Sequence, residues 1–198
     1  MRLGIMGGTF DPIHSGHVEI AKIAMEEAGL HKVVFLPDGD PPHKDSVTRG
    51  EDRLNMVKLA IADFPGFIAS DMELKRKGTT YTVDTLLELK NQDEDTDLFY
   101  IVGSDTLRLF PTWKSAGQVA SLCRMLVAPR PGDNAAETLW FANKLFHDFG
   151  LIAAVLSRFG PDISSTDIRE AVKAGRSLTG LVPLQVEDYI REKGLYLR

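Results

Sequence analysis

Short apolar runs alternate along this chain with stretches whose apolar residues recur at helical spacing. The apolar runs lie at 2–6, 32–36, 67–70, 98–102, 124–128 and 151–156. Continuous apolar runs are typical of parallel strands that are buried on both faces, and the stretches between them fit crossover helices. The pattern therefore predicts an α/β fold, a Rossmann-like, doubly wound parallel sheet.

Capping signals and glycines predict where the first helices begin and end. A helix follows Gly16 and ends at Gly29, which suits a left-handed C-terminal cap. Thr48 and Glu51 have the spacing of a capping box at the start of a second helix. A third helix begins at Val83.

The second half of the chain predicts a longer helix over 135–149 and two shorter ones beyond it. On the longer helix we expect Trp140 to pack, together with the inward-facing residues Leu139, Ala142, Leu145 and Phe146. Ser164 is placed to cap a helix that runs through Val172, and a last helix spans 183–194. The Phe-Gly-Pro break at 159–161 divides a Rossmann-like body, 1–160, from a small C-terminal helical lobe, 161–198, of the same single domain.

Composition narrows the class of protein further. Of 198 residues, 43% are hydrophobic and 26% charged, and the net charge of -5 disfavours broad contact with nucleic acid. The single cysteine, Cys123, excludes a disulfide within the chain, and no apolar run is long enough to cross a membrane. We expect a cytoplasmic protein, a monomer or small homo-oligomer, without nucleic-acid or membrane partners.

The densest chemical signal is the string Gly-Gly-Thr-Phe-Asp-Pro-Ile-His-Ser-Gly-His at 7–17, between the first strand and the first helix. Paired glycines and a helix N-terminus let main-chain N–H groups approach a phosphate. His14 and His17 are three residues apart, so both imidazoles can face one point and donate hydrogen bonds to phosphoryl oxygens. The alternatives are an ordinary turn and a metal-binding histidine pair. The turn lacks the glycine patterns of dinucleotide-binding and P-loop proteins.

A second string, Ile-Ser-Ser-Thr-Asp-Ile-Arg at 163–169, opens the helix capped by Ser164. Hydroxyl groups and free N–H groups at a helix start bind anions, and Arg169 lies one turn further on. An arginine can hold phosphate oxygens with two parallel hydrogen bonds. The alternative is a capped surface helix with a solvated arginine.

The first string resembles the H-x-G-H signature of the nucleotidyltransferase superfamily, and the second resembles the I-S-S-T-x-I-R motif of its adenylyltransferase branch. The resemblance implies that His14, His17 and Arg169 are catalytic and contact ATP phosphates. It favours ATP over CTP. The other residues expected at ATP are Gly7, Gly8, Thr9, Phe10, Gly103, Asp105, Ser164, Ser165 and Thr166.

Asp105 and Trp113 follow the fourth strand, where ligands bind in doubly wound folds. Asp105 could bind ribose hydroxyls or cap a helix. Trp113 could stack on a pyridine ring or pack in the core. The Gly-x-Asp pattern followed by tryptophan is similar to the family's, which favours the ligand interpretation for both.

Three further residues are expected to bind the acceptor: Lys44, Tyr81 and Thr82. The stretch ending in Pro-Pro-His-Lys at 41–44 resembles an element of bacterial nicotinate-nucleotide adenylyltransferases, in which Lys44 would hold a substrate phosphate. Asp40 stands where many relatives carry asparagine. The segment around Tyr81 and Thr82 would accept a carboxylate on its N–H groups. The alternatives are a solvated lysine and a capped helix.

The resemblance covers nearly the whole chain and implies transfer of AMP from ATP to nicotinate mononucleotide, giving deamido-NAD and pyrophosphate in NAD synthesis. The acceptor phosphate would attack the α-phosphorus directly. Mg²⁺ would be bound mainly through ATP, with no metal ligands from the protein. Nicotinamide mononucleotide or phosphopantetheine as acceptor, and a non-catalytic ATP or NAD sensor, are the alternatives.

Overall fold

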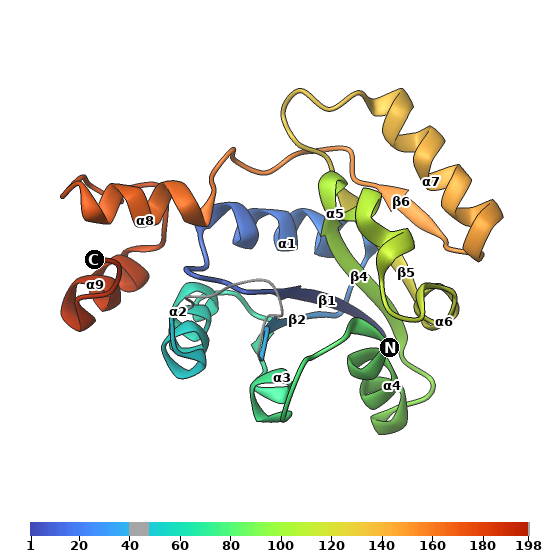
Figure 1. Ribbon diagram of the computed structural model, residues 1–198, viewed down its shortest axis with the longest axis horizontal. Coiled ribbons are helices and arrows are strands. Elements are labelled where there is room, and N and C mark those ends of the chain that lie inside the picture. The colour runs from blue at the N-terminus through green and yellow to red at the C-terminus, as the bar shows by residue number, and fades with distance from the viewer. Residues whose placement is uncertain (40–47, 198) are drawn as a thin grey trace.

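The computed structural model describes residues 1–39 and 48–197, and a parallel sheet lies at its centre (Figure 1). Its six strands are β1 (Arg2–Gly8), β2 (Lys32–Pro37), β3 (Phe67–Ala69), β4 (Asp97–Gly103), β5 (Cys123–Ala128) and β6 (Ala153–Val155). They pair in the order β3-β2-β1-β4-β5-β6. All six predicted strands are confirmed, with ends that differ by at most two residues.

Helices cover both faces of the sheet, which confirms the doubly wound α/β fold. α1 (Ser15–Ala28) and α2 (Gly50–Ile61) share one apolar cluster with α8 (Ser165–Lys173) and α9 (Leu184–Lys193). The cluster on the opposite face includes α4 (Thr82–Gln92), α6 (Ala116–Leu122) and α7 (Ala135–Phe149). Short helices that the sequence did not predict are α6, α3 (Met72–Lys75), α5 (Ser104–Leu109) and the 3₁₀ turn η1 (Phe110–Thr112).

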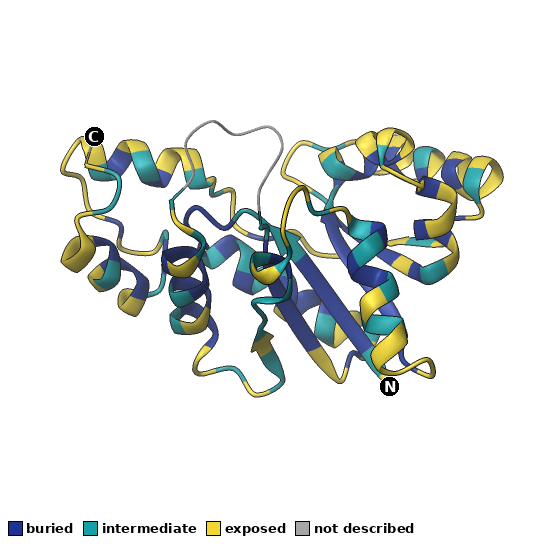
Figure 2. Ribbon diagram, turned by 60° about the horizontal axis from the view of Figure 1, so that its bottom comes forward, coloured by how far each residue is buried: buried dark blue, intermediate teal, exposed yellow. Residues whose placement is uncertain are grey.

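Successive strand residues point to opposite faces and build both clusters. In β1, Ile5 packs with the α4 and α7 side while Met6 packs with the α1 side, and in β4 Tyr100 and Ile101 divide in the same way. The central strands β1, β2, β4 and β5 are mostly dark blue in Figure 2, whereas the edge strands β3 and β6 are partly exposed and the helices show exposed outer faces. Burying each large apolar side chain stabilises the fold by roughly 1.5–3 kcal/mol. The apolar side chains on both faces of the strands therefore keep the sheet between the two layers of helices.

The C-terminal helices are packed onto the α1 face. Ile168 of α8 and Val186 and Ile190 of α9 are buried in the same cluster as Met56 of α2. In Figure 1, α8 and α9 lie at one end of the molecule, and they share one core with α1 and α2.

The start of α2 corrects a prediction. Its N-terminal cap is Arg49 and no side chain caps it, so Thr48 and Glu51 do not form a capping box. Thr48 stands outside the helix because its main chain has other partners: its N–H donates to the Asp11 carboxylate at 3.2 Å, and its carbonyl accepts from Arg53 at 2.9 Å.

The inward face of α7 is also corrected, although its bounds are as predicted. Thr138, Ala142 and Leu145 are buried, whereas Leu139 and Phe146 are 52% and 54% exposed. Trp140 is 63% exposed and does not pack in the core. Apolar residues surround this helix, so the pattern left the rotation about its axis undetermined.

Candidate active site

A cavity of about 400 Å³ opens at the carboxyl edge of the sheet, between the ends of β1 and β4. The strand order changes direction there, because β2 and β3 extend from β1 to one side while β5 and β6 extend from β4 to the other. Ligands in doubly wound folds bind at this crossover point. Gly7 at the end of β1 and Gly103 at the end of β4 both line the cavity.

The two histidines of the first motif form one stacked pair in this cavity. The His14 and His17 ring centroids are 3.6 Å apart, with 29° between the ring planes. Gly16 allows this arrangement, since a Cβ atom there would lie 3.0 Å from His14 Nδ1 and 3.2 Å from the carbonyl oxygen of Pro161. The middle glycine of the motif is thus required by packing.

Both imidazoles are uncharged near neutral pH. Burial, followed by the charge of Arg130, lowers the pKa of His14 to about 4. Burial, followed by His14, lowers the pKa of His17 well below its usual value. His17 Nδ1 accepts the main-chain N–H of His14 at 3.2 Å, which assigns the ring proton to Nε2. His17 is therefore a neutral hydrogen-bond donor, and positive charge in the cavity comes from elsewhere.

Phe10 packs against His17 from the side of the apolar core. Its backbone is left-handed, with φ at 49°, and its buried ring meets His17 edge-on at 5.1 Å and packs on Phe35. Its side chain therefore lies in the core and does not line the cavity. The neighbouring Thr9 donates its hydroxyl to Asp38 at 3.1 Å.

The second motif meets the first, through pairs of residues more than 150 positions apart. The Ser165 hydroxyl donates to the carbonyl oxygen of Pro12 at 2.9 Å, and Arg169 Nη1 donates to that of Asp11 at 2.8 Å. Arg169 Nη2 also donates to the Thr166 hydroxyl at 3.1 Å. Ser164 caps α8 as predicted, since its hydroxyl accepts the N–H of Asp167.

Asp11 collects further contacts from distant parts of the chain. Its carboxylate accepts the hydroxyl of Tyr196 at 2.6 Å as well as the N–H of Thr48. Arg53 is 2% exposed and donates to the carbonyl oxygens of Thr9 and Asp38, at 2.7 and 2.8 Å. The histidine turn is thus fixed by groups from α2, α8 and the C-terminal end of the chain.

Arg130 is a cavity residue that the sequence did not reveal. It follows β5, lines the cavity with the histidines, and donates from Nη2 to Asp105 at 2.8 Å. Asp105 lies in the first turn of α5, whose N-terminal cap is Gly103, so the capping alternative for Asp105 is wrong. The signal available was the position of Arg130 just beyond the carboxyl end of a strand, where ligands gather.

Trp113 lines the cavity, with its ring 5.7 Å from Tyr100 and 5.5 Å from Phe110. Tyr81 is the N-terminal cap residue of α4 and is 39% exposed, with the Lys114 ammonium 4.0 Å from its ring centroid. Tyr81 does not line the cavity. Lys44 lies outside the described residues, as does Asp40.

The predicted residues therefore fall into two groups. Those that line the cavity are Gly7, His14, His17, Gly103, Asp105, Trp113, Ser164 and Ser165. Those described elsewhere are Gly8, Thr9, Phe10, Tyr81, Thr82, Thr166 and Arg169. Arg169 and Phe10 of the second group contact the histidine turn, Arg169 through Asp11 and Phe10 through His17.

Two negative findings concern residues 1–39 and 48–197. This part of the chain has no group of three or more His, Cys, Asp or Glu side chains arranged to hold a metal ion. None of its helices combines the length and apolar character needed to cross a membrane.

Comparison with known proteins identifies the family. The model of the cytidylyltransferase-like family matches residues 5–171. A protein of Dehalococcoides mccartyi (strain CBDB1) named "Probable nicotinate-nucleotide adenylyltransferase" is 43% identical over all of this chain and 98% of its own length. A Geobacter (strain M21) protein of the same name is 44% identical, over all of this chain and 99% of its own.

Solved structures agree on the fold. The Plasmodium falciparum nicotinic acid mononucleotide adenylyltransferase complexed with NaAD superimposes with a TM-score of 0.82, at 19% identity, over 98% of this chain and 97% of that one. The same enzyme complexed with APC gives a TM-score of 0.79. From the family match and the full-length sequence similarity, this chain belongs to the nicotinate-nucleotide adenylyltransferase family of nucleotidyltransferases.

Proposed function

We propose that this enzyme transfers AMP from ATP to nicotinate mononucleotide, releasing pyrophosphate and deamido-NAD. One observation carries the assignment of the site. The stacked His14 and His17 pair and the start of α8 share one cavity at the crossover point of the sheet. The family to which the chain belongs supplies the reaction.

The proposed chemistry is a direct displacement. An oxygen of the acceptor phosphate forms a bond to the α-phosphorus of ATP while the bond from that phosphorus to the bridging oxygen breaks. The bonding electrons leave with pyrophosphate, and no side chain forms a covalent intermediate. The protein then acts by positioning the reactants and stabilising charge.

Each positive or hydrogen-bonding group has a distinct part in this proposal. His17 donates a hydrogen bond from Nε2–H to a phosphoryl oxygen without adding charge, since its ring is neutral. The positive charge comes from Arg130 in the cavity wall and from the N-terminal end of α8 beside Ser164 and Ser165. Arg169 holds the turn that carries the histidines.

We propose that the expected Mg²⁺ enters this site bound to the triphosphate of ATP. The described side chains provide no carboxylate or histidine cluster for a resident ion. Oxygen-rich triphosphate is a suitable ligand for Mg²⁺, which keeps several waters and binds few protein groups. We therefore assign the ion to the substrate and attribute no step to protein-bound metal.

We propose that the acceptor binds near Trp113, which lines the cavity and whose broad ring can stack on a pyridine. The N-terminal end of α4, next to Tyr81 and Thr82, would favour a carboxylate over a carboxamide because its N–H groups carry partial positive charge. Lys44 is proposed to hold the acceptor phosphate.

The test is pyrophosphate release with ATP and Mg²⁺, with nicotinate mononucleotide, nicotinamide mononucleotide and phosphopantetheine as acceptors. Strong preference for the first supports both the reaction and the carboxylate-reading site. Equal use of the two mononucleotides contradicts the account of the acceptor pocket. Release only with phosphopantetheine, or ATP binding without any release, would overturn the proposed reaction.

A further inference from the structure

The segment 157–164 joins β6 to α8 without forming a helix or strand of its own. It nevertheless supplies one wall of the cavity, through Gly160, Pro161, Asp162, Ile163 and Ser164. An irregular wall needs contacts from neighbouring elements to hold its shape, because it has no ladder of hydrogen bonds.

One end of this wall is held by close packing on the N-terminal half of α1. A Cβ atom at Gly160 would lie 2.9 Å from Ile20 Cγ1 and 3.3 Å from the carbonyl oxygen of Gly16. The carbonyl oxygen of Pro161 is as close to the Cβ position of Gly16. The wall therefore lies directly on the helix turn that carries His17.

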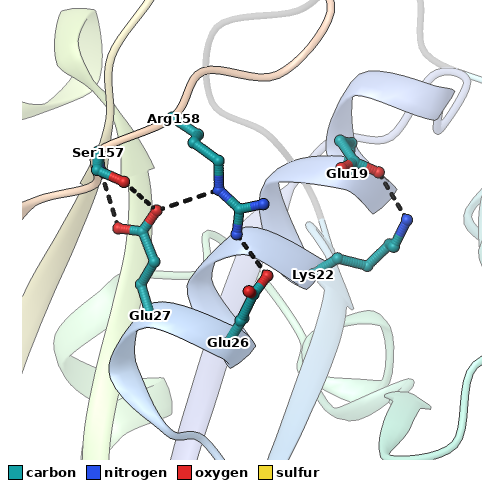
Figure 3. A network of polar contacts seen from close by, with 6 residues as sticks. All are labelled: Glu19, Lys22, Glu26, Glu27, Ser157 and Arg158. Atoms are coloured by element: carbon teal, nitrogen blue, oxygen red, sulfur yellow. Dashed lines mark hydrogen bonds and ion pairs between the residues drawn. The ribbon is translucent and has the colours of Figure 1, made fainter.

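The other end of the segment, at Ser157 and Arg158, is held by Glu27, near the C-terminal end of α1 (Figure 3). Its two carboxylate oxygens accept the main-chain N–H of Ser157 at 2.8 Å and the Ser157 hydroxyl at 2.6 Å. Arg158 donates from Nε to Glu27 at 3.4 Å and from Nη2 to Glu26 at 2.5 Å. These residues are 130 or more positions apart in sequence.

The ionised, partly buried Glu27 carboxylate fixes the position of the chain at Ser157 and Arg158. Its side chain is 24% exposed, and Arg158 is 49% exposed. Partial burial opposes ionisation of Glu27, but the hydrogen bonds from Ser157 and Arg158 outweigh it and lower the carboxyl pKa. A carboxylate that accepts two hydrogen bonds from one residue fixes both the position and the direction of the chain there.

We propose that Glu27 is a positioning residue that sets the cavity wall 160–164 and thereby the affinity for ATP. Glu27 itself does not line the cavity, so it acts through Ser157 and Arg158. The effect falls on ATP because the wall continues into Ser164 and Ser165, whereas Trp113 packs on the opposite face of the sheet. This inference rests on the proposed function.

The same helix offers a matched control. Glu19 forms an ion pair with Lys22 at 2.8 Å, away from the segment (Figure 3). Glu27→Gln and Glu19→Gln therefore make the same chemical change on one helix, and only the first disturbs the anchor. Glu27→Ala removes both acceptors, while Glu27→Gln keeps one.

The experiment measures ATP binding by calorimetry, and kcat and KM for each substrate, in the full chain. We expect Glu27→Ala to raise the Kd and KM for ATP about fivefold or more, and Glu27→Gln to raise them less. The kcat and the KM for nicotinate mononucleotide should stay within about twofold of the wild type, and Glu19→Gln should change nothing.

Two results would overturn the proposal. One is ATP affinity within about twofold of the wild type in Glu27→Ala, even where the melting temperature falls, because Glu27 would then be a stabilising contact only. The other is an equal loss of ATP affinity in Glu19→Gln. Calorimetry does not depend on turnover, so the Kd of Glu27→Ala for ATP decides the role of Glu27 in either case. A wild-type protein that binds ATP without any reaction would refute the proposed function separately.

Discussion

Arg169 and Asp11, 158 residues apart, are joined by a hydrogen bond of 2.8 Å from the guanidinium Nη1 to the main-chain oxygen. The arginine that sequence motifs assign to phosphate also holds the turn that carries the histidines. Asp11 precedes Pro12, whose own carbonyl accepts the Ser165 hydroxyl. The start of α8 and the histidine turn behave as one structural unit.

Replacing Arg169 tests that unit. Hydrogen bonds to charged groups are worth about 1.5–3 kcal/mol, so Arg169→Ala should lower kcat/KM at least tenfold. Arg169→Lys should recover little, because an ammonium cannot reach Asp11 and Thr166 with the geometry of a planar guanidinium. Steady-state kinetics of both variants provide the measurement. The exposed Arg176 serves as the control, and wild-type rates in Arg169→Ala would contradict this role.

We expect His17 to raise kcat by donating a hydrogen bond from its neutral ring to phosphate. His17→Ala removes the proposed Nε2 hydrogen bond to phosphate, and we expect kcat to fall at least about tenfold, equivalent to 1.4 kcal/mol. His147→Ala, an exposed histidine on α7, should have no effect. If pyrophosphate release by His17→Ala stays within about twofold of the wild type, the assignment of His17 is wrong.

The low pKa of His14 predicts an acid-sensitive fold. The unfolded chain protonates this histidine near pH 6.5, whereas the folded protein resists protonation down to about pH 4. Between these values the unfolded state binds more protons, so stability is lost as the pH falls. From pH 7.5 to pH 5 the loss attributable to His14 should be roughly 2 kcal/mol.

Denaturant unfolding at several pH values checks this expectation. His14→Gln should be less sensitive to acid than the wild type over pH 5 to 7.5, since it removes one of the two histidines whose pKa burial lowers. An equally steep loss of stability in His14→Gln would show that other residues cause the acid sensitivity.

Gly16 and Gly117 form a matched pair for substitution by alanine. A Cβ at Gly16 would press on His14 and Pro161, so Gly16→Ala should lower both kcat and the melting temperature. Nothing lies within 4 Å of the Cβ position of Gly117 in α6, where alanine should stabilise by roughly 0.5–1 kcal/mol. Thermal unfolding and kinetics of the two variants test the packing argument, and opposite signs are expected.

Much of the fold could be predicted because its signals are local. Buried strands show as apolar runs, Gly29 shows as a helix end, and Ser164 shows as a cap. The rotation of α7 could not be predicted, since Leu139, Trp140 and Phe146 make the helix apolar on several sides. Its core face is decided by how it packs on the sheet.

The candidate site was predictable where motifs concentrate residues and not where single residues meet across the fold. The histidine string and the string at the start of α8 are each a run of neighbouring residues, so both could be recognised in the sequence, and the hydrogen bonds that join them appear only in the structure. Arg130 stands between two prolines without a repeated pattern, and the Glu27 to Ser157 contact spans 130 positions. Such pairings depend on tertiary packing, which no local spacing encodes.

The Tyr196 hydroxyl bonded to Asp11 has a consequence for the order of folding. The two residues are 185 positions apart, so bringing them together requires closure of nearly the longest loop the chain can form. Contacts of such separation form after local ones. We therefore expect the sheet to assemble first and the histidine turn to reach its working shape last, when α9 docks. A nascent or partly unfolded chain would hold its nucleotide-binding edge without being competent for catalysis.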